Sequence, residues 1–335
     1  MAAYTTINDP EAYFQVKLYT GTNAVTSFTL DGDTDMQPDL VWLKVRSAGS
    51  GQNHTLFDSV RGVQKYVEAD TQNAEATGTA FLTAFNSDGF TLGDDQSHVN
   101  AASDTYIAWC WKESATSGFD IGTYTGNATD DTDISHSLSA VPEFIICKNR
   151  ATDGKSFYTF HTSLGNGKAI WLEDTSGSGT SATYWSDENP TSSVFTLGNS
   201  SGHNANTDAH IFYAWAGKQG FSKFGSFSGN GSATDGVYVH LGFKAAWFIC
   251  KRTNASGHDW VIFNNKALGY NPDNNTLLSN SNAVEGTADR MDILSNGIKM
   301  YNNNGSENES GGDFIYAAFA ESPFVNSSGV PNNAR

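Results

Sequence analysis

One segment occurs three times in this chain, and this repeat restricts the folds open to it. Its clearest landmark is an apolar run that ends in lysine, found at Asp39–Lys44, Glu143–Lys148 and Ala246–Lys251. The three lysines lie 104 and 103 residues apart. The copies open on Tyr19–Gly21, Tyr124–Gly126 and Phe227–Gly229, and they close on Tyr106–Trp109, Phe212–Trp215 and Ile315–Phe319. A unit of this length is a small domain, longer than one solenoid repeat. We therefore expect function in an array of like modules rather than in one catalytic cleft.

Composition favours an all-β fold with many turns. The chain of 335 residues is 13% aromatic and contains 33 glycines, while only 16% of its residues are charged. Short apolar runs separated by turn residues, without a helical period, are typical of antiparallel β-sandwiches. We therefore predict three tandem antiparallel β-sandwich-like modules with short polar end segments. The expected bounds are 1–18 for an N-terminal arm, 19–118, 119–221 and 222–321 for the first, second and third modules, and 322–335 for a C-terminal tail.

Local patterns add detail to this prediction. Leu40–Lys44 is apolar at nearly every position, which predicts a strand buried on both faces. Residues 60–76 have some helical character, although Gly62 weakens it. Asp9 and Pro10 fit the N-cap and first position of a short helix in the arm. The linkers at 117–118 and 218–220 are short, so neighbouring modules should touch.

Aromatic and cysteine positions of the repeat are expected in the core. The tryptophans that lie within apolar runs are Trp42, Trp109, Trp215 and Trp247, and this setting favours burial over a sugar-binding platform. Cys147 and Cys250 share a repeat position with Leu43, and alanine holds the position of Cys110 in the other copies. Cysteine that exchanges with leucine and alanine behaves as a small core hydrophobe. We therefore expect no disulfide and no zinc site.

The charge of the chain argues against several classes of partner. Lys and Arg number 19 against 36 Asp and Glu, which gives a net charge of −17. This balance works against non-specific phosphate binding and against an anionic membrane surface. No run reaches the ~18–20 apolar residues of a membrane-spanning helix. Met1–Thr6 lacks the basic and apolar parts of a signal peptide. We expect a protein made in a cytoplasm that neither binds nucleic acid nor inserts into a membrane.

Motifs that resemble catalytic or metal sites fail at a required position. Gly225–Gly229 has the spacing of a nucleophile elbow, but its middle residue is Phe227. Asp31–Asp35 has the alternating acids of a calcium loop, but Met36 and Trp42 stand where an EF-hand needs Gly and Glu. A calcium site that is not an EF-hand, at Asp31–Asp35 or at Asp130–Asp133, is an alternative that the sequence leaves open. We therefore predict no enzyme activity, and no catalytic, cofactor-binding or metal-binding residues.

Several segments resemble virion structural proteins of marine tailed phages, including cyanophages. The segments that carry the resemblance are Thr6–Gln15, Tyr19–Gly21, Pro38–Lys44, Leu56–Gly62, Gly89–Gly93, Ala108–Lys112 and Ala318–Phe324. The resemblance covers essentially the whole chain and is strong in the first and third modules. It implies a virion structural protein of the tail-fibre type, assembled inside a lysing host, and it carries no catalytic residues.

The resemblance and the repeat lead to one expected function and two alternatives. We expect a phage structural protein on the particle surface, as a fibre, knob or decoration subunit that contacts the host. One alternative is a glycan-binding adhesin for host recognition whose Asn- and Tyr-rich loops hold sugar. The other is a polysaccharide depolymerase, which needs two carboxyl groups about 5–9 Å apart. Expected partners are other virion proteins, a host surface glycan or receptor, and further copies of the chain, with a trimer favoured.

Overall fold

The chain folds into antiparallel β-sheets, which confirms the all-β prediction. The computed structural model describes residues 4–47, 51–95, 97–267, 271 and 273–332. A short 3-10 helix, η1 (Pro10–Ala12), precedes the first strand, and the Asp9 carboxylate caps it by accepting the Glu11 N–H at 3.0 Å. The helix predicted at Asp9 and Pro10 is therefore present. Every other regular element of the described residues is a strand.

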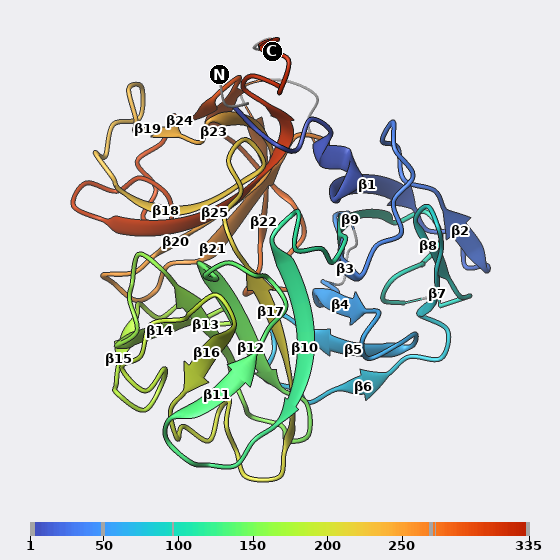
Figure 1. Cartoon of the computed structure of the whole chain (residues 1–335). Helices are drawn as coiled ribbons and strands as arrows, with labels where there is room; N and C mark the ends of the chain where they lie inside the picture. Colours follow the sequence, from blue (N-terminus) through green and yellow to red (C-terminus); the bar gives the residue numbers. More distant parts are fainter. Residues whose placement is uncertain (1–3, 48–50, 96, 268–270, 272, 333–335) are drawn as a thin grey trace.

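The first module contains a six-stranded sheet and a three-stranded sheet (Figure 1). The larger sheet has the order β1 (Phe14–Thr20), β9 (Thr105–Trp111), β3 (Leu40–Val45), β4 (Thr55–Asp58), β5 (Lys65–Glu68) and β6 (Ala76–Thr77). The smaller sheet has the order β2 (Thr26–Phe28), β8 (Phe90–Leu92) and β7 (Leu82–Phe85). Strand β1 includes residues 14–18, so the predicted bounds of 1–18 for the N-terminal arm are wrong.

The second module repeats this strand order. Its larger sheet is β10 (Phe119–Thr125), β17 (Ala209–Trp215), β12 (Phe144–Asn149), β13 (Phe157–His161), β14 (Lys168–Trp171) and β15 (Gly179–Thr180). Its smaller sheet pairs β11 (Thr132–Ser135) with β16 (Val194–Leu197). Figure 1 shows this module in green below the other two.

In the third module the two sheets are joined into one of eight strands. The order is β18 (Ser222–Ser228), β25 (Asp313–Pro323), β20 (Phe243–Arg252), β21 (Trp260–Asn264), β22 (Asp273–Leu278), β23 (Gly286–Leu294), β24 (Gly297–Met300) and β19 (Tyr238–His240). The long strand β23 pairs with both β22 and β24, and this double pairing makes the sheet continuous.

The repeated lysine has the same strand partner in each larger sheet. Lys44, Lys148 and Lys251 pair with Ile107, Ile211 and Ile315 at the same place in each larger sheet. All three lysines are buried, and each donates from Nζ to a backbone carbonyl in the loop that follows, at Gln52, Lys155 and His258. Burial lowers the pKa of each ammonium to about 8. The repeated lysine therefore stabilises the connection to the next strand in every module.

The helix considered for residues 60–76 is wrong. The segment forms a turn and strand β5, which pairs with β4 and β6. Gly62 has a φ of 83°, a left-handed conformation that glycine adopts at little cost. Arg61 Nε is held by Asp58 Oδ2 across the turn at 2.5 Å, and both side chains are buried. Strand pairing and this buried ion pair outweigh the weak helical pattern.

A single hydrophobic core joins the three modules. The expected tryptophans are all buried, with exposed fractions of 3% for Trp42, 0% for Trp109, 4% for Trp215 and 3% for Trp247. Trp247 of the third module packs against Trp42 and Trp111 of the first, with ring centroids 6.4 Å and 5.6 Å apart. Trp111 also contacts Trp215 of the second module, at 6.3 Å. The modules therefore share their interior instead of merely touching at their surfaces.

The shared core explains why the central strands are apolar at nearly every position. One face of β3 contributes Trp42 to the shared core, and the other contributes Val41 and Leu43 to a separate core inside the first module. The second module has the same division. Cys110, Cys147 and Cys250 are buried free thiols, as predicted, and burial raises the pKa of each.

Segments from both ends of the chain lie together on the third module (Figure 1). Asn8 Nδ2 donates to Ser327 Oγ and Ser327 N–H donates to Asn8 Oδ1, both at 2.7 Å. Tyr4 Oη donates to the Gly242 carbonyl at 2.9 Å. These contacts tie the segment before β1 to the third module and so connect the third module back to the first.

Candidate functional site

The three junctions between modules are built around the same backbone hydrogen bond. At the first–second junction Glu75 N–H donates to the Arg150 carbonyl at 3.0 Å. At the second–third junction Ser178 N–H donates to the Thr253 carbonyl at 2.8 Å. At the third–first junction Glu285 N–H donates to the Arg46 carbonyl at 3.0 Å. The equivalence of these positions allows the three junctions to be compared side chain by side chain.

Two of the junctions are closed by an arginine–glutamate ion pair. Arg150 Nε lies 2.7 Å from Glu75 Oε2, and Arg46 Nη2 lies 2.8 Å from Glu285 Oε2. Burial raises the pKa of Glu75, but the hydrogen bond and charge of Arg150, together with Arg61 and Lys65, outweigh it and hold this pKa below its ordinary value. The arginine and glutamate side chains of each pair form charge-assisted hydrogen bonds and also occupy the space between the modules.

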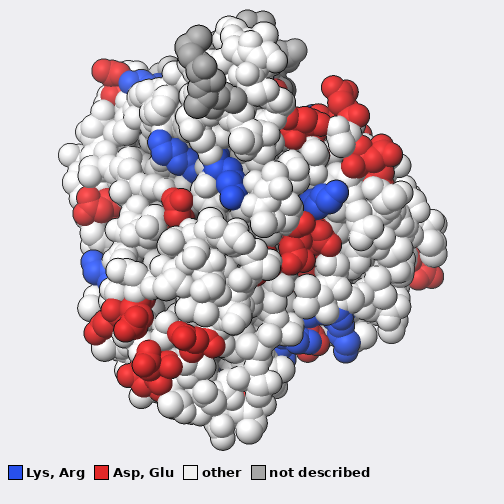
Figure 2. All heavy atoms as spheres, in the orientation of Figure 1, with Lys and Arg blue, Asp and Glu red and all other residues white. Residues whose placement is uncertain are grey.

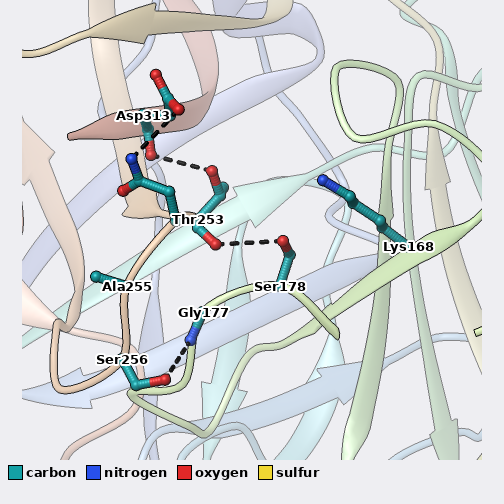
Figure 3. Close-up of a pocket in the computed structure, with 8 residues that line it drawn as sticks. Lys168, Gly177, Ser178, Thr253, Ala255, Ser256 and Asp313 are labelled. Carbon is teal, nitrogen blue, oxygen red and sulfur yellow. Dashed lines mark hydrogen bonds between the residues drawn. The ribbon is translucent and has the colours of Figure 1, made fainter. Parts of the chain in front are cut away.

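The second–third junction has a serine and a threonine in place of this pair. Ser178 Oγ donates to the Thr253 carbonyl at 3.2 Å, and the short side chains leave a hollow of about 350 Å³ (Figure 3). The hollow is lined by Lys168, Gly177, Ser178, Thr253, Asn254, Ala255, Ser256 and Asp313. A second hollow of about 410 Å³ shares Lys168, Thr253 and Asp313 with it. We call the two together the junction groove.

The second hollow extends the groove over the edge of the third module. Its further lining residues are Ser163, Leu164, Ser226, Phe227, Ser228, Phe314 and Ile315. Phe227 is half-buried and stacks on Phe314 with ring centroids 5.0 Å apart. The groove thus combines hydroxyl groups with one partly accessible aromatic side chain.

Asp313 supplies a carboxylate to one wall. Ser228 Oγ donates to Asp313 Oδ1 at 3.2 Å, and Asn254 Nδ2 donates to Asp313 Oδ2 at 3.3 Å. Neither neighbour carries a charge, and the carboxylate has no ion-pair partner within the described residues. Two neutral donors thus orient Asp313 without neutralising it. The residues equivalent to Asp313 in the first and second modules are Thr105 and Ala209. The equivalence follows from the backbone hydrogen bonds, because Thr253 N–H donates to the Asp313 carbonyl just as the N–H groups of Arg46 and Arg150 donate to the carbonyls of Thr105 and Ala209.

Lys168 supplies an ammonium to the other wall. Its backbone is fixed by pairing with Thr180 and by Trp185 Nε1, which donates to its carbonyl at 2.9 Å. Its side chain is exposed and extends toward Thr253 and Asp313 (Figure 3). Among the residues that the structure describes, no carboxylate forms an ion pair with it. A cation and an anion, each without an ionic partner, therefore face the same groove.

This arrangement suits hydrogen bonding to a polar ligand. Asp313 is the only carboxylate among the described residues that line the groove, and no histidine or cysteine lines it. Glycoside hydrolysis commonly requires two carboxyl groups on opposite sides of the bond that is cleaved. Hydroxyl, amide, ammonium and carboxylate groups together can donate to and accept from a hydroxylated ligand.

A pair of neighbouring carboxyl groups lies elsewhere, at the link between the first and second modules. Burial raises the pKa of Glu113 to about 7, and a hydrogen bond and the charge of Asp120 act in the same direction. Ser137 N–H donates to Asp120 Oδ2 at 2.9 Å. Because the two carboxyl groups are hydrogen-bonded to each other, they lack the separation of about 5–9 Å that a glycosidase pair needs.

The candidate calcium loops have local structural roles. In the first, Lys17 Nζ lies 2.5 Å from Asp31, and Gly32 N–H donates to Gln15 Oε1 at 2.8 Å. In the second, Ser186 Oγ donates to Asp130 Oδ1 at 2.9 Å. The described part of the chain contains no group of three or more His, Cys, Asp or Glu side chains placed to hold a metal ion. Phe227 of the elbow-like motif lies in strand β18.

Acidic side chains form patches on the surface, as Figure 2 shows for one face of the molecule. On loops of the second module, the exposed residues include Asp130, Asp131, Asp187 and Glu188, and a hydrogen bond from Ser186 to Asp130 joins the two loops. Lysine and arginine are scattered over the same face, and large uncharged areas separate the patches. On this face the acidic charge is therefore concentrated locally.

Sequence patterns alone do not identify the junction groove. A usable signal was present two residues after the repeated lysine, where the copies carry Arg46, Arg150 and Thr253. The second signal was the matching change from Glu75 and Glu285 to Ser178. Neither change has meaning until the structure shows that these positions meet across the module junctions.

Comparison with known proteins gives a family but no activity. The model of a family described as a domain of unknown function, DUF7483, matches residues 9–323. A search of curated proteins found no match. Within the described residues, no helix is both long enough and apolar enough to cross a membrane.

Proposed function

The chain belongs to the DUF7483 family, and within it we propose the role of a structural protein displayed on the surface of a phage particle. The subunit would be a fibre, knob or decoration protein that contacts the host. The resemblance of its repeat segments to marine tailed-phage virion proteins supports this proposal. The description of the family names no activity, so the proposal also depends on the architecture.

The observation that carries the proposal is the single core shared by three β modules. Trp247 reaches Trp42 and Trp111 of another module, so the chain forms one closed body rather than a flexible string of domains. The segments that contain Asn8 and Ser327 lie together at one end (Figure 1). A closed body with its end segments on one side suits attachment there and display of the remaining surface.

Electron microscopy of purified particles tests this proposal. Antibody fragments against the recombinant protein should label one defined structure of the particle, such as the tail or the capsid surface. Fragments raised against an unrelated β-sandwich protein serve as the control. Purified particles that carry no label, from a lysate in which the protein is abundant, would exclude a displayed structural role.

Assembly with further copies of the chain is part of the same proposal. Identical chains usually associate through rotational symmetry, and we expect a homo-oligomer, with a trimer favoured. The net charge of −17 per chain opposes close contact, so the interface should consist of apolar and amide groups with acids at its rim. Light scattering of the purified protein should give a mass of three chains. A monomer of 36.0 kDa at high concentration would contradict this expectation.

Glycan binding is a second candidate function, and the junction groove favours it. The groove presents Lys168, Asp313 and several hydroxyl groups beside Phe227. Concave sites with a few oriented polar groups are the common form of small-ligand sites. Immobilised host-surface glycans should retain the wild-type protein, and closure of the groove by substitution should abolish retention. Equal retention of both proteins would exclude the groove as the binding site.

A further inference from the structure

We propose that the junction groove binds an acidic saccharide, whose anionic group pairs with Lys168 and whose hydroxyl groups donate to Asp313. This inference rests on the proposed contact with the host and names the ligand class of that contact. The comparison of the three junctions carries it.

The equivalents of Lys168 in the other modules show why the ligand should be anionic. Lys65 occupies the same place in the first module, since Lys65 pairs with Thr77 as Lys168 pairs with Thr180. The charge of Lys65 contributes to lowering the pKa of Glu75. In the third module the equivalent residue, Asn275, donates from Nδ2 to Glu285 Oε2 at 2.9 Å.

At the second–third junction the carboxylate is missing. Ser178 stands where Glu75 and Glu285 stand, so Lys168 keeps its place without the neighbouring carboxylate. Its ammonium is exposed, and no acid of the described residues pairs with it. An anionic group from a ligand can occupy the space of the missing carboxylate and restore the charge-assisted contact.

The opposite wall favours hydroxyl donors. Thr253 leaves open the space that an arginine fills at the other two junctions, and Asp313 adds a carboxylate there. Ser228 and Asn254 hold Asp313 in place with one hydrogen bond each. An ionised carboxylate has about four acceptor positions, so positions remain for ligand hydroxyls. A ring that carries both an anionic group and neighbouring hydroxyls matches both walls.

The length of the groove favours an oligosaccharide over a single sugar. The two hollows, of about 350 and 410 Å³, share Lys168, Thr253 and Asp313 and continue past Phe227. Ligand sites in proteins typically have volumes of about 300–1,000 Å³. The half-buried ring of Phe227 offers an apolar surface beside the hydroxyl groups of Ser226 and Ser228.

Titration calorimetry with three tetrasaccharides tests the proposal. One carries uronate carboxylates, one carries sulfate groups and one is neutral. We expect at least one acidic tetrasaccharide to bind about tenfold or more tightly than the neutral one, because loss of a charged contact commonly costs a factor of this size. The stronger of the two acidic ligands identifies the anionic group. Equal binding of all three would overturn the acidic preference.

Two lysine variants separate the groove from general charge effects. Lys168→Met should weaken the acidic ligand about tenfold and leave the neutral ligand nearly unchanged. Lys65→Met, at the equivalent position of the first module, is the matched control and should bind like the wild type. Equal losses in both variants would overturn the role of Lys168. Asp313→Asn should weaken acidic and neutral ligands alike, and unchanged binding would overturn the role of the carboxylate.

A groove-closing variant completes the test. The double substitution Ser178→Glu and Thr253→Arg introduces the ion pair found at the other two junctions. We expect binding of all tetrasaccharides to be lost while the melting temperature stays at or above the wild-type value. Retained binding in a folded double variant would overturn the groove as the site. Labelling of phage particles is an independent measurement, so a failed saccharide site leaves the test of the structural role intact.

Discussion

The first–second and second–third junctions use the same backbone hydrogen bond and differ in what surrounds it. At the former, Arg150 and Glu75 form an ion pair that fills the junction. At the latter, Thr253 and Ser178 leave a hollow with Lys168 and Asp313 on its walls. The backbone framework is thus independent of the side chains placed on it. A repeated fold can therefore open a site at one copy while equivalent positions stay closed.

The largest expected effect on stability tests whether the three modules unfold together because they share one hydrophobic core. Trp247→Ala should lower the free energy of unfolding by about 3–5 kcal/mol, because it removes a large side chain from a packed interior. Urea denaturation followed by far-ultraviolet circular dichroism measures this. Loss of structure should remain one cooperative transition.

The outcome that would contradict the shared core is a partial effect. If the third module melted early while the other two kept the wild-type midpoint, the modules would be separate folding units. Lys266→Met serves as a surface control, since Lys266 is exposed and its substitution should change stability by less than about 0.5 kcal/mol.

A smaller effect distinguishes the closed junction from the open one. Arg150→Met removes one partner of a partly exposed ion pair, and we expect a loss of about 1–2 kcal/mol, between the values for exposed and buried pairs. Thr253→Val, at the equivalent position of the open junction, should cost less. Chemical denaturation of both variants compares them directly, and a larger loss for Thr253→Val would reverse the assignment.

Acid should weaken the second–third junction through His161. His161 is buried, its ring Nε2 lies 3.0 Å from the Tyr316 carbonyl across this junction, and burial lowers its pKa to about 4. In the unfolded chain this histidine has an ordinary pKa of about 6.5. Between pH 4 and pH 6.5 the unfolded chain therefore binds more protons than the folded protein. The stability contributed by neutral His161 is therefore present above about pH 6.5 and is lost as the pH falls toward 4.

The variant His161→Gln isolates this contribution, because a glutamine amide can still donate to the Tyr316 carbonyl. Melting temperatures between pH 7 and pH 4 should fall less steeply in the variant than in the wild type. Parallel curves would assign the acid sensitivity to other groups. His54, His203 and His210 have pKa values that burial also lowers, so the variant should retain part of the slope.

The smallest expected effect concerns hydrolysis, for which we expect no activity. An open groove with one carboxylate should bind a polysaccharide without cleaving it, so incubation with host-surface polysaccharide should release no new reducing ends above a blank. Steady release would favour the depolymerase alternative. The Asp313→Asn variant would then show whether the groove carries that activity.

The sequence predicted the parts of the fold that depend on local patterns. The lysine-ended runs identified the central strands of the larger sheets, because a strand buried on both faces must be apolar at nearly every position. Burial of the tryptophans followed from the same runs. The helix expected at residues 60–76 is wrong because a few apolar residues can fit either a helix or a turn followed by a strand.

The shared core and the groove depend on contacts between distant segments, so local patterns could not predict them. Trp42 and Trp247 are 205 positions apart in the sequence and meet only in the folded chain. The groove arises from differences between copies at Ser178 and Thr253, whereas a repeat is recognised by what its copies have in common. A comparison of the copies at positions that meet across the junctions would have been needed.

Closure of the modules around the tryptophans has a consequence for how such a chain can change its length. Linear repeat proteins bury each unit only against its neighbours, so a unit can be gained or lost at modest cost. Here each module supplies side chains to one shared hydrophobic core, in which Trp247 packs against Trp42 and Trp111. Deletion of one module would expose the shared core to water, and a fourth module could not pack against it, because the three modules already surround it. Copy number is thus set by geometry, and new properties can arise only through divergence within the existing copies.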